Sequence, residues 1–322
     1  MAAQSPMVLE HLALSRSVLD RDGASRGDPR TLERALSDSA TRVLVLVGDR
    51  ARAESGGGST HLTLRSPAVG DSDGLLLYLG RDPRGTAYLA VVSAAGPEQP
   101  HDPAGQPWRS LREIGADLDE LEVGVLTSAL ALAQWHARHV RCPLCGGATV
   151  PEEGGWQRRC VDDDSVHHPR TDPAVIVAVV DEDDRILLGR GPTWPPGRLS
   201  VLAGFVEPGE SLEAAVVREV YEEVGVTVSD LHYRGNQPWP FPASLMVGFT
   251  ARATDTSLTL DPREISEARW LSRQELARAV DVGEIGLPTP VSIARRLIED
   301  WYGGPLLPAA EVAGPFRGAD AQ

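Results

Sequence analysis

The 322-residue sequence predicts a mixed α/β protein, and three observations support this class. Short apolar runs bounded by glycine, proline and aspartate, which are typical of strands, occur in both halves of the chain. Between the halves, residues 117–139 carry apolar side chains at helical spacing. A second helical segment begins at Ser211, after further strand-like runs. A chain of this length has room for two domains of about 100–200 residues each.

The charge balance limits the chemistry that the chain can perform. All 31 basic residues are arginine, and 46 acidic residues leave a formal net charge of −15. Without lysine, the chain cannot use a Schiff-base lysine, anchor pyridoxal phosphate or form the lysine of a P-loop. The acidic balance also argues against a protein that wraps a nucleic-acid backbone, which needs clustered positive charge. Phosphate groups must therefore be neutralised by arginine, backbone N–H groups or metal.

The apolar runs and the cysteines indicate a cytoplasmic protein. The N-terminus lacks a basic segment followed by an apolar run, so we expect no signal peptide. The longest strongly apolar run, 174–180, is too short to cross a bilayer, and we expect no membrane partner. Three cysteines cannot form a paired disulfide framework, and two of them stand as Cys-x-x-Cys. This usage is typical of a metal site in a reducing compartment.

Residues 1–115 are predicted to form the first domain. Its expected strands are Val43–Val47, Leu75–Leu79 and Tyr88–Val92, each bounded by turn-forming residues. We expect the polar stretches 54–61 and 66–74 to be exposed loops. This region holds no group of residues that carries chemistry, so we expect a structural or dimer-forming domain.

The rest of the chain divides into four predicted parts. These are a linker helix over 116–140, a cysteine-containing segment over 141–170, a catalytic domain over 171–302 and a loosely ordered tail over 303–322. The catalytic domain opens with a βαβ-like segment. Its expected elements are strands at Ala174–Val180, at Arg185–Leu188 and near Val201, followed by the helix from Ser211.

A cluster of carboxylates lies on that helix, between a suitable N-cap at Ser211 and a helix-ending glycine at Gly225. At about 100° per residue, Glu219 and Glu223 lie on the same side as the apolar face, with Glu222 about 60° away from Glu219. Like charges at this spacing repel and need a counter-charge. Clustered carboxylates are ligands that Mg²⁺ or Mn²⁺ prefers, although an isolated cluster on a helix is more often a solvated face.

The residues around this cluster resemble the signature of the Nudix hydrolases. That signature is a glycine, five residues, a glutamate, seven residues and then R-E-hydrophobic-x-E-E-x-G-hydrophobic. Segment 204–226 fits it without a gap at Gly204, Glu210, Arg218, Glu219, Val220, Glu222, Glu223, Gly225 and Val226. The resemblance implies an α/β/α sandwich for the catalytic domain and a Nudix-like α/β fold for the first domain. It also implies metal-dependent hydrolysis of a nucleoside diphosphate linked to another group.

A second motif follows the helix and reads Gln237, Pro238, Trp239, Pro240, Phe241, Pro242, Ala243 and Ser244. Its three prolines fix the backbone, so the two aromatic rings are presented with little ordering cost on binding. The string resembles the SQPWPFPxS signature of the NADH pyrophosphatase (NudC-type) branch, with Asn236 in place of the leading serine. In that branch the segment lines the dinucleotide pocket, which implies that these eight residues bind substrate.

Other segments resemble the same branch over about residues 120–302, and the N-terminal third does so weakly. The implied Mg²⁺ or Mn²⁺ ligands are the carbonyl of Ala203 and the carboxylates of Glu219, Glu223 and Glu264. The implied substrate contacts outside the proline-rich motif are Phe205 and Ala294, with His168 standing where the branch has a tyrosine. We expect Arg218 to orient a glutamate within the helix and Glu210 to support the junction before it.

The zinc ribbon of the branch is matched incompletely. Its pattern is C-x₂-C, fourteen residues and C-x₂-C, fitted here by Cys142, Cys145 and Cys160 with Asp163 in the fourth position. Aspartate can bind zinc but is rarer in structural sites. Three alternatives stay open: Asp163 is the fourth ligand, His167 or His168 replaces it, or packing holds the fold without Zn²⁺.

The implied reaction is hydrolysis of the diphosphate bond of NADH or NAD⁺, which gives AMP and the nicotinamide mononucleotide. The same chemistry would remove NAD caps from RNA 5′ ends, although a net charge of −15 offers no evident track for the RNA. Glu222 or Glu223 would accept the proton of the attacking water, and the sequence does not separate ligand from base. The resemblance also implies a homodimer.

Three alternative functions are weighed against this one. A general Nudix pyrophosphatase acting on ADP-ribose or related nucleotides would not need the proline-rich motif. A nucleotide sensor without turnover would not need the intact glutamates. A nucleic-acid-binding zinc-ribbon protein is disfavoured by the acidic charge and by Asp163.

Overall fold

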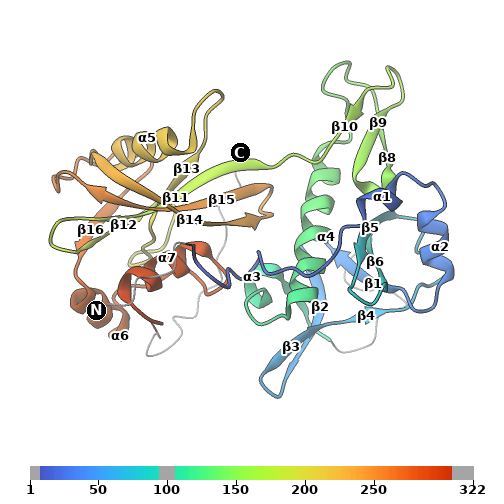
Figure 1. The fold of residues 1–322 in the computed structure, drawn as a ribbon, viewed down its shortest axis with the longest axis horizontal. Helices are drawn as coiled ribbons and strands as arrows, with labels where there is room; N and C mark the ends of the chain where they lie inside the picture. Colours follow the sequence, from blue (N-terminus) through green and yellow to red (C-terminus); the bar gives the residue numbers. More distant parts are fainter. Residues whose placement is uncertain (1–7, 94–105, 307–322) are drawn as a thin grey trace. The chain divides into compact units, whose positions relative to one another are not determined.

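The computed structural model describes residues 8–93 and 106–306, which form two compact units (Figure 1). The N-terminal unit comprises residues 13–171 together with 238–244. The C-terminal unit comprises the residues up to Leu12, residues 172–237 and the chain from 245 onward. Among the described residues, no helix is long and apolar enough to cross a membrane.

The N-terminal unit contains a mixed sheet in the order β3-β2-β1-β6-β5, with β4 paired to β1 and β7 paired to β2. The strands are β1 (Arg42–Val47), β2 (Arg50–Gly56), β3 (Ser59–Leu62), β4 (Leu64–Arg65), β5 (Leu75–Arg81), β6 (Ala87–Ser93) and β7 (Trp108–Ser110). Strands β1 and β6 run parallel. The three strands predicted from the sequence are confirmed as β1, β5 and β6, and residues 66–74 lie outside strands as expected.

The expected loop at 54–61 is wrong, because these residues form a hairpin between β2 and β3. Gly56 pairs with Ser59, and the two residues between them, Gly57 and Gly58, have φ angles of +62° and +86°. Positive φ at both central positions is typical of a type I′ turn, for which glycine is favoured. The outer part of the hairpin is exposed, so it lacks the alternation of apolar residues that reveals a strand.

Helices cover the sheet of this unit. They are α1 (Gly23–Arg26), α2 (Thr31–Ser37), α3 (Leu111–Ile114) and α4 (Glu120–Arg138). Ala35 of α2 packs with Val43, Tyr78 and Leu89 in one hydrophobic core. The long helix α4 contacts β1, β5 and β6 and confirms the helix predicted over 117–139. Asp119 caps it by accepting hydrogen bonds from two backbone N–H groups of its first turn.

Helix α4 leads into a three-stranded ribbon in the order β10-β9-β8. Its elements are β8 (Thr149–Glu152), the 3₁₀ turn η1 (Glu153–Gly155), β9 (Gln157–Cys160) and β10 (Val166–His167). Buried His136 of α4 lies 2.8 Å from the carbonyl oxygen of Gly155 and 2.7 Å from Nη1 of Arg158. Arg158 in turn donates to the hydroxyl and the carbonyl oxygen of Thr149, so one buried network joins α4 to the ribbon.

The C-terminal unit contains a sheet in the order β14-β15-β11-β12-β16, with β13 paired to β11. The strands are β11 (Asp172–Val180), β12 (Ile186–Arg190), β13 (Leu202–Phe205), β14 (Val228–Trp239), β15 (Ser244–Ala253) and β16 (Glu267–Leu271). The helices are α5 (Leu212–Val224), α6 (Arg273–Asp281) and α7 (Ile293–Tyr302).

Strand β11 shows that this unit is a sandwich with helices on both faces of the sheet. Its residues Val175, Val177 and Val179 belong to the core that includes α5, whereas Ile176 and Ala178 belong to the core that includes α6 and α7. Figure 1 shows the same layering, with α5 on one side of the sheet and α7 on the other. The predicted α/β/α sandwich is confirmed.

The βαβ-like interpretation of this region is wrong. Strand β11 pairs antiparallel with both β12 and β13. Asp181 closes the short turn between β11 and β12 by bonding Arg185, and so short a connection allows only an antiparallel hairpin. A parallel pair needs a crossover of a dozen residues or more.

The two ends of the described chain pack in the C-terminal unit. Leu9 and Leu12 join its core, and the Leu9 N–H group donates to the Arg234 carbonyl oxygen over 2.7 Å. At the other end, Gly303 closes α7 and Leu306 is buried. The remainder of the predicted tail, 307–322, and the first seven residues lie outside the described residues. The boundaries given above for the sequence domains remain a proposal.

Candidate active site

The predicted carboxylate helix is confirmed as α5, with both of its ends fixed by local chemistry. The Ser211 hydroxyl accepts from the Ala214 N–H group, and Gly225 adopts a left-handed conformation at the C-terminal end. Glu219 and Glu223 are buried at the edge of the apolar face, whereas the side chain of Glu222 is exposed. The helical projection from the sequence therefore places these three carboxylates correctly.

Glu264 reaches the same place through the loop that precedes β16. The Thr259 and Asp261 N–H groups donate to the carbonyl oxygens of Val224 and Glu223, at the C-terminal end of α5. Asp261 then accepts from the Glu264 N–H group over 3.1 Å. One carboxylate oxygen from each of Glu219, Glu223 and Glu264 lies within 4.8 Å of the others. The structure thus brings together the three side-chain ligands expected for Mg²⁺ or Mn²⁺.

Gly204 on β13 makes room for this cluster. Its backbone is not left-handed, so conformational freedom is not the reason for glycine here. A Cβ atom at this position would overlap the carboxylate of Glu219. Register fixes the approach, because β13 pairs with β11 through Gly204 opposite Val175 and Phe205 opposite Ala174. Glycine at this position therefore lets α5 lie close enough to the sheet to present Glu219.

Arg218 orders the acidic side chains around it. Its guanidinium donates to both carboxylate oxygens of Glu210 over 2.8 Å and to the carboxylates of Glu219 and Glu222 over 2.9 Å. It also donates to the carbonyl oxygen of Phe205 over 2.9 Å. These bonds lower the pKa of Glu210 to about 2 and raise the pKa of Arg218. Arg218 acts inside the protein as a scaffold for the carboxylates, as the sequence analysis expects.

The electrostatics of the cluster favour a bound cation. Burial, together with the charges of Glu219 and Glu264, raises the pKa of Glu223 to about 8. Burial also raises the pKa of Glu219. The buried Oε2 atom of Glu223 has no hydrogen-bond partner in the protein. Burying a carboxylate oxygen without a partner costs free energy, and a bound hard divalent cation offsets that cost by accepting the oxygen as a ligand. These residues therefore fit a divalent metal.

Four other predicted site residues belong to the C-terminal unit. Ala203 and Phe205 are exposed on β13, and 58% of the Phe205 surface is accessible. Gln237 is fully buried, and its side-chain amide donates to the Val291 carbonyl oxygen over 2.9 Å. Ala294 is buried in the first turn of α7. Gln237 therefore fixes the start of the proline-rich motif, while Phe205 presents an open ring to solvent.

The rest of the proline-rich motif, 238–244, belongs to the N-terminal unit and is described there. Trp239 and Phe241 pack edge to face, with ring centres 5.0 Å apart and planes at 68°. Both rings are half-buried, so part of each surface is open. His168, the predicted substitute for a substrate-binding tyrosine, is exposed after β10 in the same unit.

The ribbon brings together the three cysteines and the aspartate of the predicted zinc site. Sulfur atoms of Cys142, Cys145 and Cys160 and a carboxylate oxygen of Asp163 all lie within 4.8 Å of one another. His167 lies beside this group but is not part of it: its Nε2 atom is 3.0 Å from the Ser165 hydroxyl, which lies 3.3 Å from Sγ of Cys142. Three thiols and a carboxylate fit Zn²⁺. Asp163 therefore completes a group of four possible ligand atoms, to which neither His167 nor His168 belongs.

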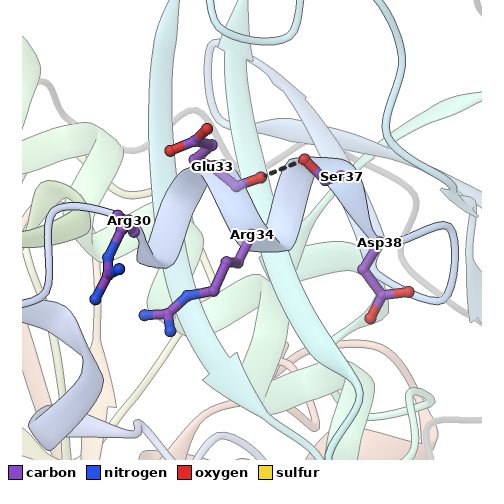
Figure 2. A pocket seen from close by; sticks show the side chains of 5 residues that line it. All are labelled: Arg30, Glu33, Arg34, Ser37 and Asp38. Atoms are coloured by element: carbon purple, nitrogen blue, oxygen red, sulfur yellow. Dashed lines mark hydrogen bonds between the residues drawn. The ribbon is translucent and has the colours of Figure 1, made fainter.

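A separate hollow lies beside α2 and holds none of these residues. Figure 2 shows its lining side chains, Arg30, Glu33, Arg34, Ser37 and Asp38, with the Ser37 hydroxyl bonded to the Glu33 carbonyl oxygen. Charges of both signs are mixed there, and Arg34 forms an ion pair with Asp28. The hollow is consistent with an ordinary polar surface.

One residue with a clear structural link to the predicted site was missed by the sequence analysis. Arg112 of α3 lies against the rings of Trp239 and Phe241. No sequence signal could reveal this contact, because the partners are far apart in the chain and Arg112 belongs to a region without a motif. The contact is a product of the tertiary fold.

Comparisons with known proteins identify the family. The NUDIX domain model matches residues 170–287, and the model of the NADH pyrophosphatase zinc ribbon domain matches residues 137–168. The chain is similar to the NAD-capped RNA hydrolase NudC of Mycobacterium tuberculosis (strain ATCC 25618 / H37Rv), with 38% identity over 296 residues. That alignment covers 88% of this chain and 94% of the relative.

A second relative matches over a shorter region. The chain is 43% identical over 196 residues to the human NAD-capped RNA hydrolase NUDT12. This alignment covers 57% of this chain but only 42% of that relative. Among solved structures, a Nudix hydrolase from Nitrosomonas europaea covers 51% of this chain and 94% of its own, with 22% identity and a TM-score of 0.39. From the match along almost the whole mycobacterial relative and the two family models, we conclude that this chain belongs to the Nudix hydrolases, in the branch that carries the NADH pyrophosphatase zinc ribbon.

Proposed function

We propose that this protein hydrolyses the diphosphate bond of NADH and NAD⁺ and removes the NAD cap from RNA 5′ ends. The observation that carries the proposal is that Glu264, from the loop before β16, lies with Glu219 and Glu223 of α5, whose sequence fits the Nudix signature. The proline-rich motif and the names of the two relatives support a dinucleotide substrate. Water adds to one phosphorus, the bridging P–O bond breaks, and AMP and the nicotinamide mononucleotide leave.

The metal site in this proposal is built from residues that fit Mg²⁺ or Mn²⁺. The carboxylates of Glu219, Glu223 and Glu264 and the carbonyl oxygen of Ala203 would hold the ions. Bound divalent cations neutralise the diphosphate and lower the pKa of the attacking water. Arg218 keeps Glu219 and Glu222 in place through its hydrogen bonds. Glu222 or Glu223 takes the proton of the water.

The substrate contacts in this proposal come from aromatic rings and short side chains. Phe205 offers an exposed ring for stacking, and Trp239 and Phe241 offer a half-exposed pair. Base–aromatic stacking is favourable for every base, because each has a π face. The other proposed contacts are Gln237, Pro238, Pro240, Pro242, Ala243, Ser244, Ala294 and His168. We further propose a Zn²⁺ ion held by the ribbon cluster, a homodimer and a cytoplasmic location.

The test is a substrate panel with the purified protein. NADH, NAD⁺, ADP-ribose and NAD-capped RNA are incubated with Mg²⁺, with Mn²⁺ or with a chelator, and the products are identified. We expect metal-dependent AMP from NADH and NAD⁺ and a 5′-monophosphate on the RNA. Turnover of ADP-ribose alone would instead indicate a general pyrophosphatase. Absence of metal-dependent AMP from NADH would refute the proposal.

Two variants separate metal ligand from base. Glu223→Gln and Glu222→Gln are compared, with Glu213→Gln, an exposed carboxylate on the same helix, as control. We expect Glu223→Gln to lower kcat by about 100-fold or more. A base acts after the metal has bound. Loss of the base therefore lowers kcat but leaves the Mn²⁺ concentration needed for half-maximal activity unchanged. Loss of a ligand raises the Mn²⁺ concentration needed for half-maximal activity. Full activity of Glu223→Gln would remove that residue from the site.

A further inference from the structure

Arg112 of α3 contacts both aromatic rings of the proline-rich motif. Its guanidinium carbon lies 3.9 Å from the ring centre of Phe241 and 5.0 Å from that of Trp239. Both distances lie within the range of about 6 Å in which a cation is attracted to an aromatic face. One guanidinium thus bridges two rings that already pack edge to face. All three residues belong to the N-terminal unit.

The backbones on both sides of this contact are held firmly. Leu111 and Ile114, which flank Arg112 on α3, are buried at 0% and 3% exposure. Ser110 and Glu113 form a capping box at the start of α3. On the other side, Pro238, Pro240 and Pro242 restrict the backbone of the motif. Proline restricts only the backbone, so contacts set the side-chain torsions of the two rings, and the Arg112 guanidinium provides one such contact to each ring.

Arg16 and the loop between α3 and α4 also hold α3 in place. Arg16 donates from its guanidinium to the carbonyl oxygens of Gly115, Ala116 and Leu118. The Gly115 N–H group donates to the Leu111 carbonyl oxygen over 2.8 Å. Arg112 therefore projects from a fixed base toward the rings, and its contact does not depend on a mobile segment.

We propose that Arg112 is a positioning residue that holds Trp239 and Phe241 in the orientation on which a base of the dinucleotide stacks. The inference rests on the proposed function, since it assigns the rings to substrate binding. Ordering a side chain on binding costs conformational entropy, so rings ordered in advance bind a base more tightly. The carboxylates are ordered separately by Arg218, so removing Arg112 weakens substrate binding and leaves the chemical step intact.

The kinetic test compares Arg112→Gln, Arg112→Lys and the control Arg26→Gln. Arg26 makes the same kind of contact in the same unit, with its guanidinium carbon 3.6 Å from the ring centre of Trp156, but that ring lies in the ribbon. We expect Arg112→Gln to raise KM for NADH about threefold to tenfold and to leave kcat within about twofold. Lysine keeps the cation, so Arg112→Lys recovers part of the loss. Arg26→Gln leaves KM unchanged.

Fluorine NMR provides a readout that does not depend on turnover. The chain has four phenylalanines, so 4-fluorophenylalanine gives four resonances, and Phe241→Leu identifies the one of interest. We expect Arg112→Gln to move and broaden the Phe241 resonance, because a charge leaves the ring face and the ring gains motion. Arg26→Gln leaves that resonance in place. Titration with NADH in the absence of divalent metal shifts it in the wild type.

The outcomes separate this inference from the proposed function. An inactive wild type in which Arg112→Gln still moves the Phe241 resonance would refute the function alone. An active wild type with unchanged KM in Arg112→Gln would overturn the positioning role. An equal rise of KM in Arg26→Gln would also overturn it, because general destabilisation of the unit would then be the cause.

Discussion

Single residues decide where the carboxylates of the site lie. Arg218 draws Glu210, Glu219 and Glu222 around one guanidinium, and Gly204 leaves the space that the Glu219 carboxylate occupies. The chain has no lysine, so a delocalised guanidinium with several donors performs this ordering. The signature residues are therefore of two kinds: those proposed to hold a cation and those that hold the carboxylates in place.

Replacing Gly204 tests the packing role. In Gly204→Ala the new methyl group overlaps Glu219, so the carboxylate must move away from its partners. We expect the Mn²⁺ concentration for half-maximal NADH hydrolysis to rise by about tenfold or more, since residues that support ligands contribute on this scale. Gly286→Ala is the control, because a Cβ there meets open space in the same unit. An unchanged metal requirement in Gly204→Ala would contradict the role assigned to this glycine.

At the scale of whole elements, hydrogen bonds at the ends of helices fix the segments that carry the candidate site residues. Helix α5 presents its carboxylates because Ser211 and Gly225 set its ends and because the loop before β16 bonds to its last carbonyl groups. The ribbon is held to the end of α4 in a similar way, by a buried polar network instead of a cap residue. In that network His136 of α4 contacts Gly155 and Arg158. In both cases, hydrogen bonds at the end of a helix fix a segment that carries proposed metal ligands.

The His136 network predicts a pH dependence of stability. A carbonyl oxygen only accepts, so His136 Nε2 carries the proton toward Gly155 and Nδ1 accepts from Arg158. Burial and the Arg158 charge lower the pKa of His136 to about 4 from 6.5. Between these values the unfolded chain binds a proton that the folded protein does not. The stabilisation is therefore complete above pH 6.5 and is lost as the pH falls toward 4.

The size of this effect is about 3 kcal/mol at full protonation, from about 1.4 kcal/mol per pKa unit. Urea unfolding monitored between pH 7.5 and 4.5 measures it. His136→Gln is the control, because glutamine can donate to Gly155 and accept from Arg158 without titrating. We expect the wild type to lose more stability than this variant below pH 6.5. Parallel pH profiles for the two proteins would show that His136 is not the group responsible.

The ribbon cluster predicts a gain in zinc affinity when the unusual ligand is replaced. Thiolate is the usual fourth ligand of closed structural zinc sites, so Asp163→Cys should bind Zn²⁺ about tenfold more tightly or better. Competition with a chromogenic chelator measures the affinity directly. Asp162→Cys adds a thiol next to the cluster and serves as control. Zinc binding by Asp163→Cys that is no tighter than that of the wild type would contradict this prediction.

At the scale of the whole molecule, the chain crosses between its two units more than once. It starts in the C-terminal unit, builds the N-terminal unit, returns at Asp172 and contributes 238–244 to the N-terminal unit again. Leu9 and Leu12 complete a core formed mainly by residues from 176 to 306. Neither unit is therefore a simple continuous piece of sequence.

This arrangement predicts that the N-terminal segment stabilises the C-terminal unit. Leu12 is 5% exposed, so Leu12→Ala should lower the free energy of unfolding by about 2–4 kcal/mol. Val8→Ala is the control, because 43% of the Val8 surface is exposed. Denaturant unfolding followed by tryptophan fluorescence gives the comparison. Equal stability of Leu12→Ala and Val8→Ala would show that the segment adds nothing to the core.

Much of the candidate site could be predicted from the sequence, because its main part is local. Glu219, Glu222 and Glu223 share one helix, so 3.6 residues per turn and two cap residues suffice to place them. The apolar strands β1, β5, β6 and β11 were equally evident, since burial on a sheet requires continuous or alternating apolar residues. The β2–β3 hairpin was missed because an exposed edge leaves no such pattern.

By itself the sequence determined the α/β class, the carboxylate helix, the family resemblance and the cysteine spacing, all of which depend on residues close together in the chain. Only the tertiary structure decided that Glu264 joins the cluster, that the Asp163 carboxylate lies with the three cysteines, and that Arg112 contacts Trp239 and Phe241. Backbone hydrogen bonds at the end of α5, the ribbon turns and the packing of α3 make these contacts. Such interactions join distant residues without any periodic signal, so sequence spacing cannot reveal them.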